Sequence, residues 1–463
     1  MIEIYKNKKI YLFIVIGVLT GLIACFTGVW IIAIVAGVIF FLITLLNPKF
    51  GVFILIFLQL GLAQSTTGLS RIESIYILFF GAVIIGWILR KLLNKKIAIN
   101  HSSLNLPILL FLAICFFSFI KAFYNNITIT NWFIGWQVFL TLILFFIILN
   151  EFQSKKQLKP LIYSFLLVTA LICIKDIFSV IQQGGFQNIW QVAGNQFASL
   201  FFIMAIPFAI AIFLTTKNFW FKWIQIFLLL LFLFRLLISL MRSYILALLV
   251  ILTIFVIALL ILKILKNKKI FFRTINLIVL LCIIFAIVFM VFPGEINRII
   301  KNNIVRFLVL KDFSSPENIS AYTRIVEIKN VWSYVIKQPL LGYGFGFKYQ
   351  YYRPNQEFYN VSYVHFVPLF FVLKIGFIGV LSVIWLISRV LILNWQVIKR
   401  EQDFFWKILE IAIFSNFIGI LILSLFITSV IRIDSIFYFT LMIGMIAVLR
   451  KLQNRPELLR ESY

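Results

Sequence analysis

The sequence predicts an all-α protein that crosses a membrane many times. Of its 463 residues, 63% are hydrophobic and 12% are charged, and the mean hydropathy is +1.09. Apolar runs of about 17 to 25 residues, the length of helix that spans a bilayer, recur along the whole chain. A single run satisfies its own backbone hydrogen bonds in lipid only as a helix, whereas the strands of a membrane barrel alternate apolar and polar residues.

The apolar runs define the expected helices. They divide into 14 segments, and we expect about 12 to 14 transmembrane helices with one large extracytoplasmic loop. The first two form a retained hairpin, because a cleaved signal peptide needs no second apolar run behind it. The third is short enough to be re-entrant or tilted. The segments lie near residues 10–26, 28–46, 52–64, 74–92, 106–123, 132–149, 160–182, 196–215, 223–241, 243–262, 274–293, 367–393, 406–430 and 435–449.

Positive charge predicts the orientation of these helices. With the N-terminus in the cytoplasm, 25 Lys and Arg lie at cytoplasmic segments, and two, Arg71 and Arg432, lie in short outer loops. This asymmetry follows the positive-inside rule, which predicts that both termini are cytoplasmic. The formal net charge of +27 is then mainly a topology signal, and we expect a lipid bilayer, not nucleic acid, as the partner.

The hydropathy divides the chain into three parts. N-terminal transmembrane helices occupy residues 1–293, a large extracytoplasmic loop occupies 294–366, and C-terminal helices with a short cytoplasmic tail occupy 367–463. The loop carries nine Lys or Arg against five acids, a net charge of +4. Long loops are translocated largely regardless of charge. A basic outer loop therefore indicates an anionic ligand at the outer leaflet.

The loop contains three notable patterns. From Arg324, apolar residues recur at helical spacing up to Pro339, which predicts an amphipathic helix near the membrane surface. Gly342, Gly344 and Gly346 follow at alternate positions, a run that permits either a plain tight turn or close approach of the backbone to a ligand.

The third pattern is a cluster of tyrosines around Arg353. These tyrosines belong either to the aromatic belt of the bilayer surface or to a stacking surface for sugar rings. His365 follows where the chain re-enters the membrane, and it is either structural or a proton carrier. The tyrosines are Tyr349, Tyr351, Tyr352, Tyr359 and Tyr363.

Charged residues inside apolar runs are the second informative set, because burying a charge in lipid costs at least a few kcal/mol. Arg235 and Arg242 are seven residues apart, so we expect them on one face of one helix. Lys374 lies about two turns after His365. Arg242, Arg324 and Lys374 are candidates to converge on a phosphate, since guanidinium groups offer bidentate geometry and permanent charge.

No metal or cofactor site is predicted. All four cysteines lie inside apolar runs without paired spacing, and the chain has only two histidines, His101 and His365. The cysteines are interpreted as small buried hydrophobic residues.

Four stretches together resemble the O-antigen ligase and polymerase superfamily of bacterial surface-polysaccharide enzymes, over about residues 190–380. These are "GNQFASLFFIMAIP", "LISLMRSYILALLVIL", "TRIVEIKNVWSYVIKQPLLGYGFG" and "HFVPLFFVLKIGFIG", and their order and spacing fit the family. Two residues depart from its pattern: Phe366 stands where an Asn is usual, and Lys374 where an acid is usual. The acceptor side of the site is affected by both departures.

The resemblance implies a metal-independent glycosyltransferase of the bacterial inner membrane. It would move a glycan from an undecaprenyl-diphosphate-linked oligosaccharide donor to a hydroxyl of a glycan or lipid acceptor at the outer face. Arg242 and Arg324 would hold the diphosphate, and His365 would activate the acceptor hydroxyl. Further substrate contacts would come from Arg235, Lys374, Arg353, Tyr349, Tyr351, Gly342 and Gly344.

Three alternatives remain open at this point. A polymerase would extend the chain onto another lipid-linked unit, and we favour it because such enzymes occur with and without an outer membrane. A ligase would deliver the finished chain to lipid A core or another acceptor. A transporter of lipid-linked oligosaccharide would need its charges at the midplane, whereas here they gather toward the outer side.

Overall fold

The fold is described from a computed structural model of the chain, which describes residues 29–62, 71–93, 100–182, 199–239, 241–291, 294, 319–352 and 358–454. Within these ranges, nine helices are long and apolar enough to cross a membrane, and four further apolar helices are shorter. The predicted all-α polytopic membrane protein is thereby confirmed. The expected helix at 10–26 and the first part of the large loop lie outside the described residues.

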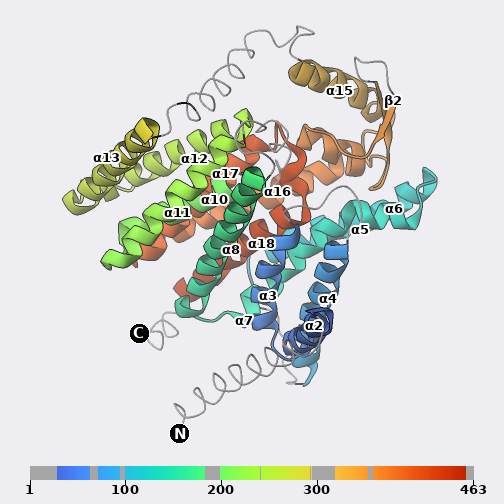
Figure 1. Cartoon of the computed structure of the whole chain (residues 1–463). Coiled ribbons are helices and arrows are strands. Elements are labelled where there is room, and N and C mark those ends of the chain that lie inside the picture. Colours follow the sequence, from blue (N-terminus) through green and yellow to red (C-terminus); the bar gives the residue numbers. More distant parts are fainter. Residues whose placement is uncertain are drawn as a thin grey trace. The chain divides into compact units, whose positions relative to one another are not determined.

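The described helices follow the predicted segments closely, with most ends displaced by a few residues (Figure 1). In chain order they are α2 (Val29–Leu46), α3 (Pro48–Leu62), α4 (Arg71–Leu93), α5 (Asn105–Tyr124), α6 (Ile129–Trp136), η1 (Gln137–Ile143), α7 (Leu144–Glu151), α8 (Lys155–Gln182), α10 (Ser199–Thr215), α11 (Phe219–Ile238), α12 (Arg242–Ile261), η4 (Ile264–Lys266), α13 (Lys268–Val291), α15 (Ile319–Val335), α16 (Val367–Arg400), α17 (Phe404–Leu423), η6 (Thr428–Ile431) and α18 (Ile433–Gln453).

By its internal contacts the chain forms two compact units, residues 1–55 with 74–98, and residues 56–73 with 99–463. In the smaller unit, α4 packs directly on the end of α2. A Cβ atom on Gly86 would lie 2.2 Å from the Leu45 carbonyl oxygen, so only glycine allows this approach. The division at residues 293 and 366 followed hydropathy instead of packing, and it stays a prediction.

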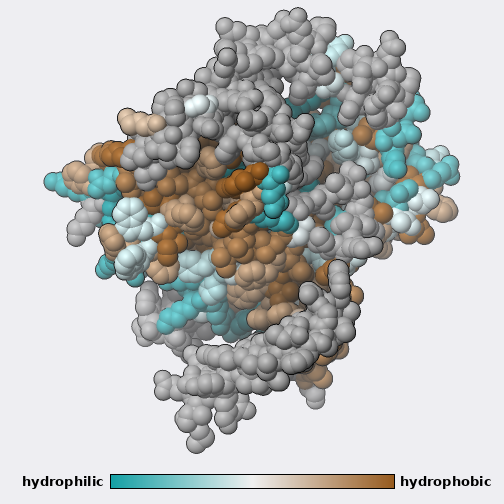
Figure 2. Space-filling model, in the orientation of Figure 1, coloured by the Kyte–Doolittle hydropathy of each residue, from teal (hydrophilic) through white to brown (hydrophobic). Residues whose placement is uncertain are grey.

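The core of the larger unit is formed by α10, α17 and α18. Nearly every described side chain of α10 and of α18 is buried. Helices that are apolar all round belong in such positions. By contrast, α5, α11 and α12 expose large apolar side chains, as a lipid-facing surface requires. Figure 2 shows hydrophobic side chains over the middle of one face, where α8, α10 and α11 run in Figure 1.

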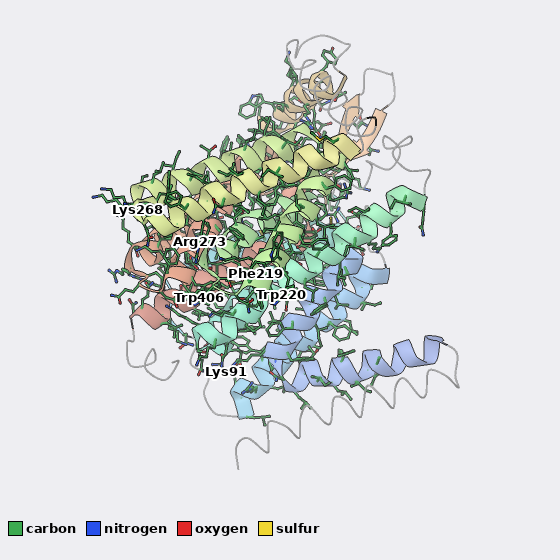
Figure 3. The ribbon with its side chains drawn as sticks, turned by 60° about the vertical axis from the view of Figure 1, so that its left-hand side comes forward. Lys91, Phe219, Trp220, Lys268, Arg273 and Trp406 are labelled. Atoms are coloured by element: carbon green, nitrogen blue, oxygen red, sulfur yellow. The ribbon has the colours of Figure 1, made fainter. Side chains whose placement is uncertain are left out.

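Polar contacts tie together the ends of the helices that carry most of the basic residues. Lys155, at the start of α8, pairs with Glu401 after α16 at 2.6 Å. Asn100 donates from its backbone to Asn150 at 3.0 Å. Arg273 donates to the Leu214 carbonyl at 2.8 Å, and Figure 3 shows Arg273 and Lys268 at the same end of α13. We call this the basic end of the larger unit.

Two features of the fold differ from the expectation. The predicted helix 223–241 ends at Ile238, and α12 begins at Arg242, so Arg235 and Arg242 lie on separate helices and not on one shared face. The predicted helix 132–149 is an α-helix, a 3₁₀ stretch and a second α-helix, all within one apolar span. Hydropathy places the end of the first helix three residues too late, because Leu240 and Met241 continue the apolar run. It does not separate α6, η1 and α7, because only the polar residues Gln137 and Thr141 interrupt the predicted segment.

The large loop also contains a two-stranded sheet that the sequence did not indicate. Strand β1 (Tyr349–Tyr352) pairs antiparallel with β2 (Phe358–Val361), with Tyr349 opposite Val361 and Tyr352 opposite Phe358. Figure 1 shows α15 and these strands at one end of the larger unit, near α6. A Cβ atom on Gly135 of α6 would lie 2.7 Å from the Gly346 nitrogen. We call the end of the larger unit that carries α15, β1 and β2 the loop end.

Helix α16 is broken where the loop docks on it. Gly376 has φ +65° and ψ −175°, which interrupts the helix. The carbonyls of Leu373 and Lys374 accept from the backbone of Tyr343 and Gly344, each at 2.9 Å. In return, the Phe377 and Ile378 amides donate to Pro339 and Leu340, at 2.9 and 3.3 Å. Backbone groups freed inside a membrane helix need such partners.

Candidate active site

Helix α15 presents one buried line of residues to the rest of the protein. Glu327, Val331 and Val335 are spaced by four residues and are all buried, so they share one face, and α15 packs on α16 and β1. The predicted apolar face is split between this line and an exposed one. The exposed apolar residues are Ile325, Ile328, Trp332 and Ile336.

The buried carboxylate of Glu327 is the centre of the site. Its Oε2 lies 2.9 Å from Nδ1 of His365 and accepts from the His365 backbone N–H at 3.2 Å. Its Oε1 accepts from the Tyr349 hydroxyl at 2.8 Å. The Glu327 side chain is 4% exposed, whereas that of His365 is 40% exposed. The arrangement therefore holds one edge of an otherwise accessible imidazole.

His365 lies just before α16, close to the end of α17. Two residues later, the Val367 amide donates to the Ser424 carbonyl at 3.0 Å, which fixes the start of α16 against α17. The Tyr363 ring packs edge-on against the imidazole, with ring centroids 5.6 Å apart. The chain is thus fixed on both sides of His365, while the ring itself remains accessible.

The two predicted arginines lie on two helices, α15 and α12. Arg324 lies one turn before Glu327 on α15 and is half-buried. Arg242 is the first residue of α12, and its side chain lies outside what the structure describes. Two residues on, the Tyr244 hydroxyl contacts Ser429 at 2.7 Å, which places the start of α12 near η6 at the end of the bundle where α16 begins.

A comparison with known families covers this region. Residues 227–384 match the family model described as O-antigen ligase. We call residues 227–384 the O-antigen ligase segment, after the family model that they match. The resemblance to the O-antigen ligase and polymerase superfamily is confirmed by this match, which supports a membrane glycosyltransferase of that type. Among curated proteins, a search finds no match to the chain.

The O-antigen ligase segment runs from α11 into α16. It therefore includes Arg242, Arg324 and His365, together with the buried acid Glu327. The stretch "GNQFASLFFIMAIP" precedes the matched range.

Arg235, also in the O-antigen ligase segment, is engaged by another part of the protein. It is buried and pairs with Asp176 of α8, with its Nη2 and Nε at 2.9 and 3.0 Å from one carboxylate oxygen. Its guanidinium also lies 5.6 Å from the Phe202 ring centre. This arrangement joins α11, α8 and α10, so its role in the structure is helix packing. The predicted contact with substrate stays a prediction.

Lys374 is likewise buried, at the break in α16. Its ammonium group donates to the Phe347 carbonyl and lies 5.5 Å from the Phe370 ring centre. It therefore holds the residue that follows Gly346 against α16. A phosphate contact by Lys374 remains a prediction.

The space beside the glycines of the O-antigen ligase segment is occupied by other parts of the protein. Gly342 and Gly344 have φ of +64° and +88°, a region that side chains disfavour. A Cβ atom on Gly342 would meet Leu373 and Lys374, and one on Gly344 would meet Ala122, all within 2.8 Å. The close approach that the sequence indicated is thus made to α16 and α5.

Two tyrosines of the loop likewise make their contacts within the protein. Tyr349 is fully buried, so its ring offers no face to a sugar and its hydroxyl supports Glu327 instead. Between the glycines, burial raises the pKa of the Tyr343 phenol, which stays protonated and donates to the Tyr334 carbonyl at 3.1 Å. Tyr351 belongs to β1, but its side chain, like all of Arg353, lies outside the described residues.

Glu327 is the site residue that sequence reasoning missed. In the sequence it is only one of the five acids of the loop. A sign was nevertheless present, because Glu327 lies four and eight residues before two apolar positions, Val331 and Val335, on one helical line. An acid on a buried line needs a partner, and the nearby histidine supplies it.

Proposed function

We propose that this protein is a glycosyltransferase that works at the outer face of the bacterial inner membrane. It transfers a glycan from an undecaprenyl-diphosphate carrier to an acceptor hydroxyl. The observation that carries the proposal is the contact of His365 with Glu327 of α15, one helical turn from Arg324. All three residues lie in the O-antigen ligase segment. A proton acceptor and a permanent cation are thus held on elements that contact each other.

The reaction needs one proton transfer and one charged leaving group. The acceptor oxygen attacks the anomeric carbon of the donor glycan while His365 takes the hydroxyl proton. The bond from that carbon to the diphosphate oxygen breaks, and undecaprenyl diphosphate leaves with the bonding electron pair. Arg242 and Arg324 offset the charge that develops on the leaving oxygen. This division of roles explains why two types of residue are required at one place.

The acceptor is proposed to be another lipid-linked glycan, which makes the protein a polysaccharide polymerase. A ligase would use the same step with lipid A core or another acceptor in place of that glycan. Transport is less favoured, because His365 and α15 lie at one end of the bundle and not at its middle. The buried charges of Arg235 and Asp176 pair with each other, so they do not favour transport either.

The proposed orientation rests on the two ends of the larger unit. The basic end carries Lys155, Lys268 and Arg273, and positive residues favour the cytoplasmic side. The loop end lies at the other end of the same helices, because α16 runs from Val367, two residues after His365, to Arg400 beside Glu401. The candidate site would then face the outer leaflet, and both termini would be cytoplasmic.

The test is a deletion strain whose surface glycans are resolved on a gel, complemented with single variants. Single repeat units on the acceptor indicate a lost polymerase, and long glycan left on the carrier lipid indicates a lost ligase. Normal glycan would contradict both. Arg324→Ala and Arg242→Ala should each lower transfer about a hundredfold or more, the usual worth of one oriented donor at a developing oxyanion. His365→Ala should also lower transfer about a hundredfold or more, the usual worth of a general base.

Two variants complete this experiment. Arg324→Lys should still lower transfer, because an ammonium group cannot reproduce the bidentate fork of a guanidinium. His101→Ala is the matched control for His365→Ala, since His101 is exposed beside Asn100 at the basic end. It should leave transfer unchanged at equal expression. Full activity in Arg324→Ala would refute a role for α15 in diphosphate binding.

A further inference from the structure

We infer that Glu327 is the positioning residue of His365, and that it holds the imidazole as the tautomer with hydrogen on Nδ1. This inference deepens the proposed function and rests on it for its catalytic consequence. Its structural part, the tautomer, is independent of any activity.

The geometry fixes the donor and acceptor roles. An ionised carboxylate can only accept hydrogen bonds, and Oε2 of Glu327 lies 2.9 Å from Nδ1. Nδ1 must therefore carry the hydrogen when the ring is neutral. The lone pair is then on Nε2, on the opposite edge of a ring whose side chain is 40% exposed. Which nitrogen carries the proton is set in this way by the partner of the other one.

The carboxylate itself is held in place from several directions. Oε2 also accepts from the backbone N–H of His365 at 3.2 Å, so the same oxygen fixes both the main chain and the ring. Oε1 faces the Tyr349 hydroxyl at 2.8 Å, and that hydroxyl also lies 3.0 Å from the Tyr363 carbonyl oxygen. Burial of Glu327 strengthens these contacts, because little water competes for them.

This tautomer affects the reaction both before and after His365 takes the proton. With Nε2 unprotonated and accessible, the ring can accept the acceptor's hydroxyl proton without first rearranging. The imidazolium that forms then has a carboxylate beside Nδ1, which stabilises its positive charge. Glu327 does not touch the substrate in this scheme. It acts only through His365.

The experiment reads the tautomer directly. His101→Gln leaves His365 as the one histidine of the chain, because the sequence has only two. In this background, protein with ¹⁵N-labelled histidine in lipid nanodiscs should show hydrogen on Nδ1 of the neutral ring. Glu327→Gln should move the population toward hydrogen on Nε2, since the amide can turn its NH₂ group toward Nδ1. An unchanged tautomer in Glu327→Gln, or hydrogen on Nε2 in the parent, would overturn the inference.

Kinetics test the catalytic consequence with the same variants. Glu327→Gln should lower kcat by about a hundredfold or more, as losing the correct tautomer does in other histidine bases, while KM for the donor stays within about twofold. Glu327→Asp keeps an acceptor and should recover part of the loss. The control is Glu151→Gln, the same chemical change at the end of α7, which should leave both constants unchanged.

The two proposals fail in different ways. If no lipid-linked glycan is transferred by the parent protein, the proposed function falls and the tautomer spectra still decide the positioning role. If transfer occurs and Glu327→Gln retains full kcat, the positioning role is refuted and the proposed function stands.

Discussion

Replacing Gly344 by alanine should detach the large loop from the helices that support it. Gly344 has φ +88°, and a Cβ atom there would lie 2.6 Å from the Ala122 nitrogen and 2.8 Å from its Cα. The left-handed backbone costs a non-glycine residue about 1–2 kcal/mol, and overpacking adds about 1–3 kcal/mol. The backbone atoms of α5 cannot turn aside as a flexible side chain would. The free energy of unfolding should therefore fall by about 2–5 kcal/mol.

Thermal unfolding of the purified protein in nanodiscs measures this loss, and limited proteolysis shows where it occurs. Gly344→Ala should unfold at a lower temperature and be cleaved faster within the loop than the parent. The matched control is Gly81→Ala in α4, where a Cβ atom would meet nothing within 4 Å and alanine favours the helix. An unfolding temperature and a cleavage pattern equal to the parent's in Gly344→Ala would refute the docking of the loop on α5.

Three further predictions concern topology, metal and the buried ion pair. A reporter fused at Lys268 should read cytoplasmic and one at Asn318 should read outside; a cytoplasmic reading at Asn318 would place the chemistry on the wrong face. Transfer by purified membranes should survive EDTA, since arginines are proposed to neutralise the leaving group; loss in EDTA with recovery in Mg²⁺ would contradict this. Arg235→Ala should destabilise by about 3–5 kcal/mol because it leaves Asp176 buried and unpaired, whereas Arg235→Met with Asp176→Leu should restore stability and, if Arg235 only packs helices, activity.

The sequence predicts the helices well because membrane insertion depends on local hydropathy. The predicted segment 28–46 is α2 at 29–46, and the segment 243–262 is α12 at 242–261. A run of apolar residues has only one way to satisfy its backbone in lipid, so no distant contact is needed to recognise it. The junction between α11 and α12 is also predicted, since the segments 223–241 and 243–262 meet there, but hydropathy places the end of α11 three residues too late.

The site is less predictable, because its roles depend on which partner each side chain meets. Arg235 and Arg324 have the same chemistry and both lie in the matched segment, yet Arg235 faces Asp176 from another helix. Glu327 and His365 are 38 residues apart, and only the return of the chain to α16 brings them together. Spacing along one helix cannot report such pairs.

The break in α16 explains how a surface helix becomes a precise part of the site. Beyond its C-terminal end, α15 leads into residues 339–344, which exchange four backbone hydrogen bonds with the two sides of Gly376. At its middle, α15 is fixed by Glu327 to His365, and His365 lies two residues before the same helix α16. Two attachments to one helix leave α15 little freedom to rotate. Arg324, one turn from Glu327, is then held at a set distance from the imidazole even though it lies on a loop. A continuous α16 would have no free carbonyls to hold the glycine run, so the interruption in the membrane helix is what allows the loop to carry chemistry.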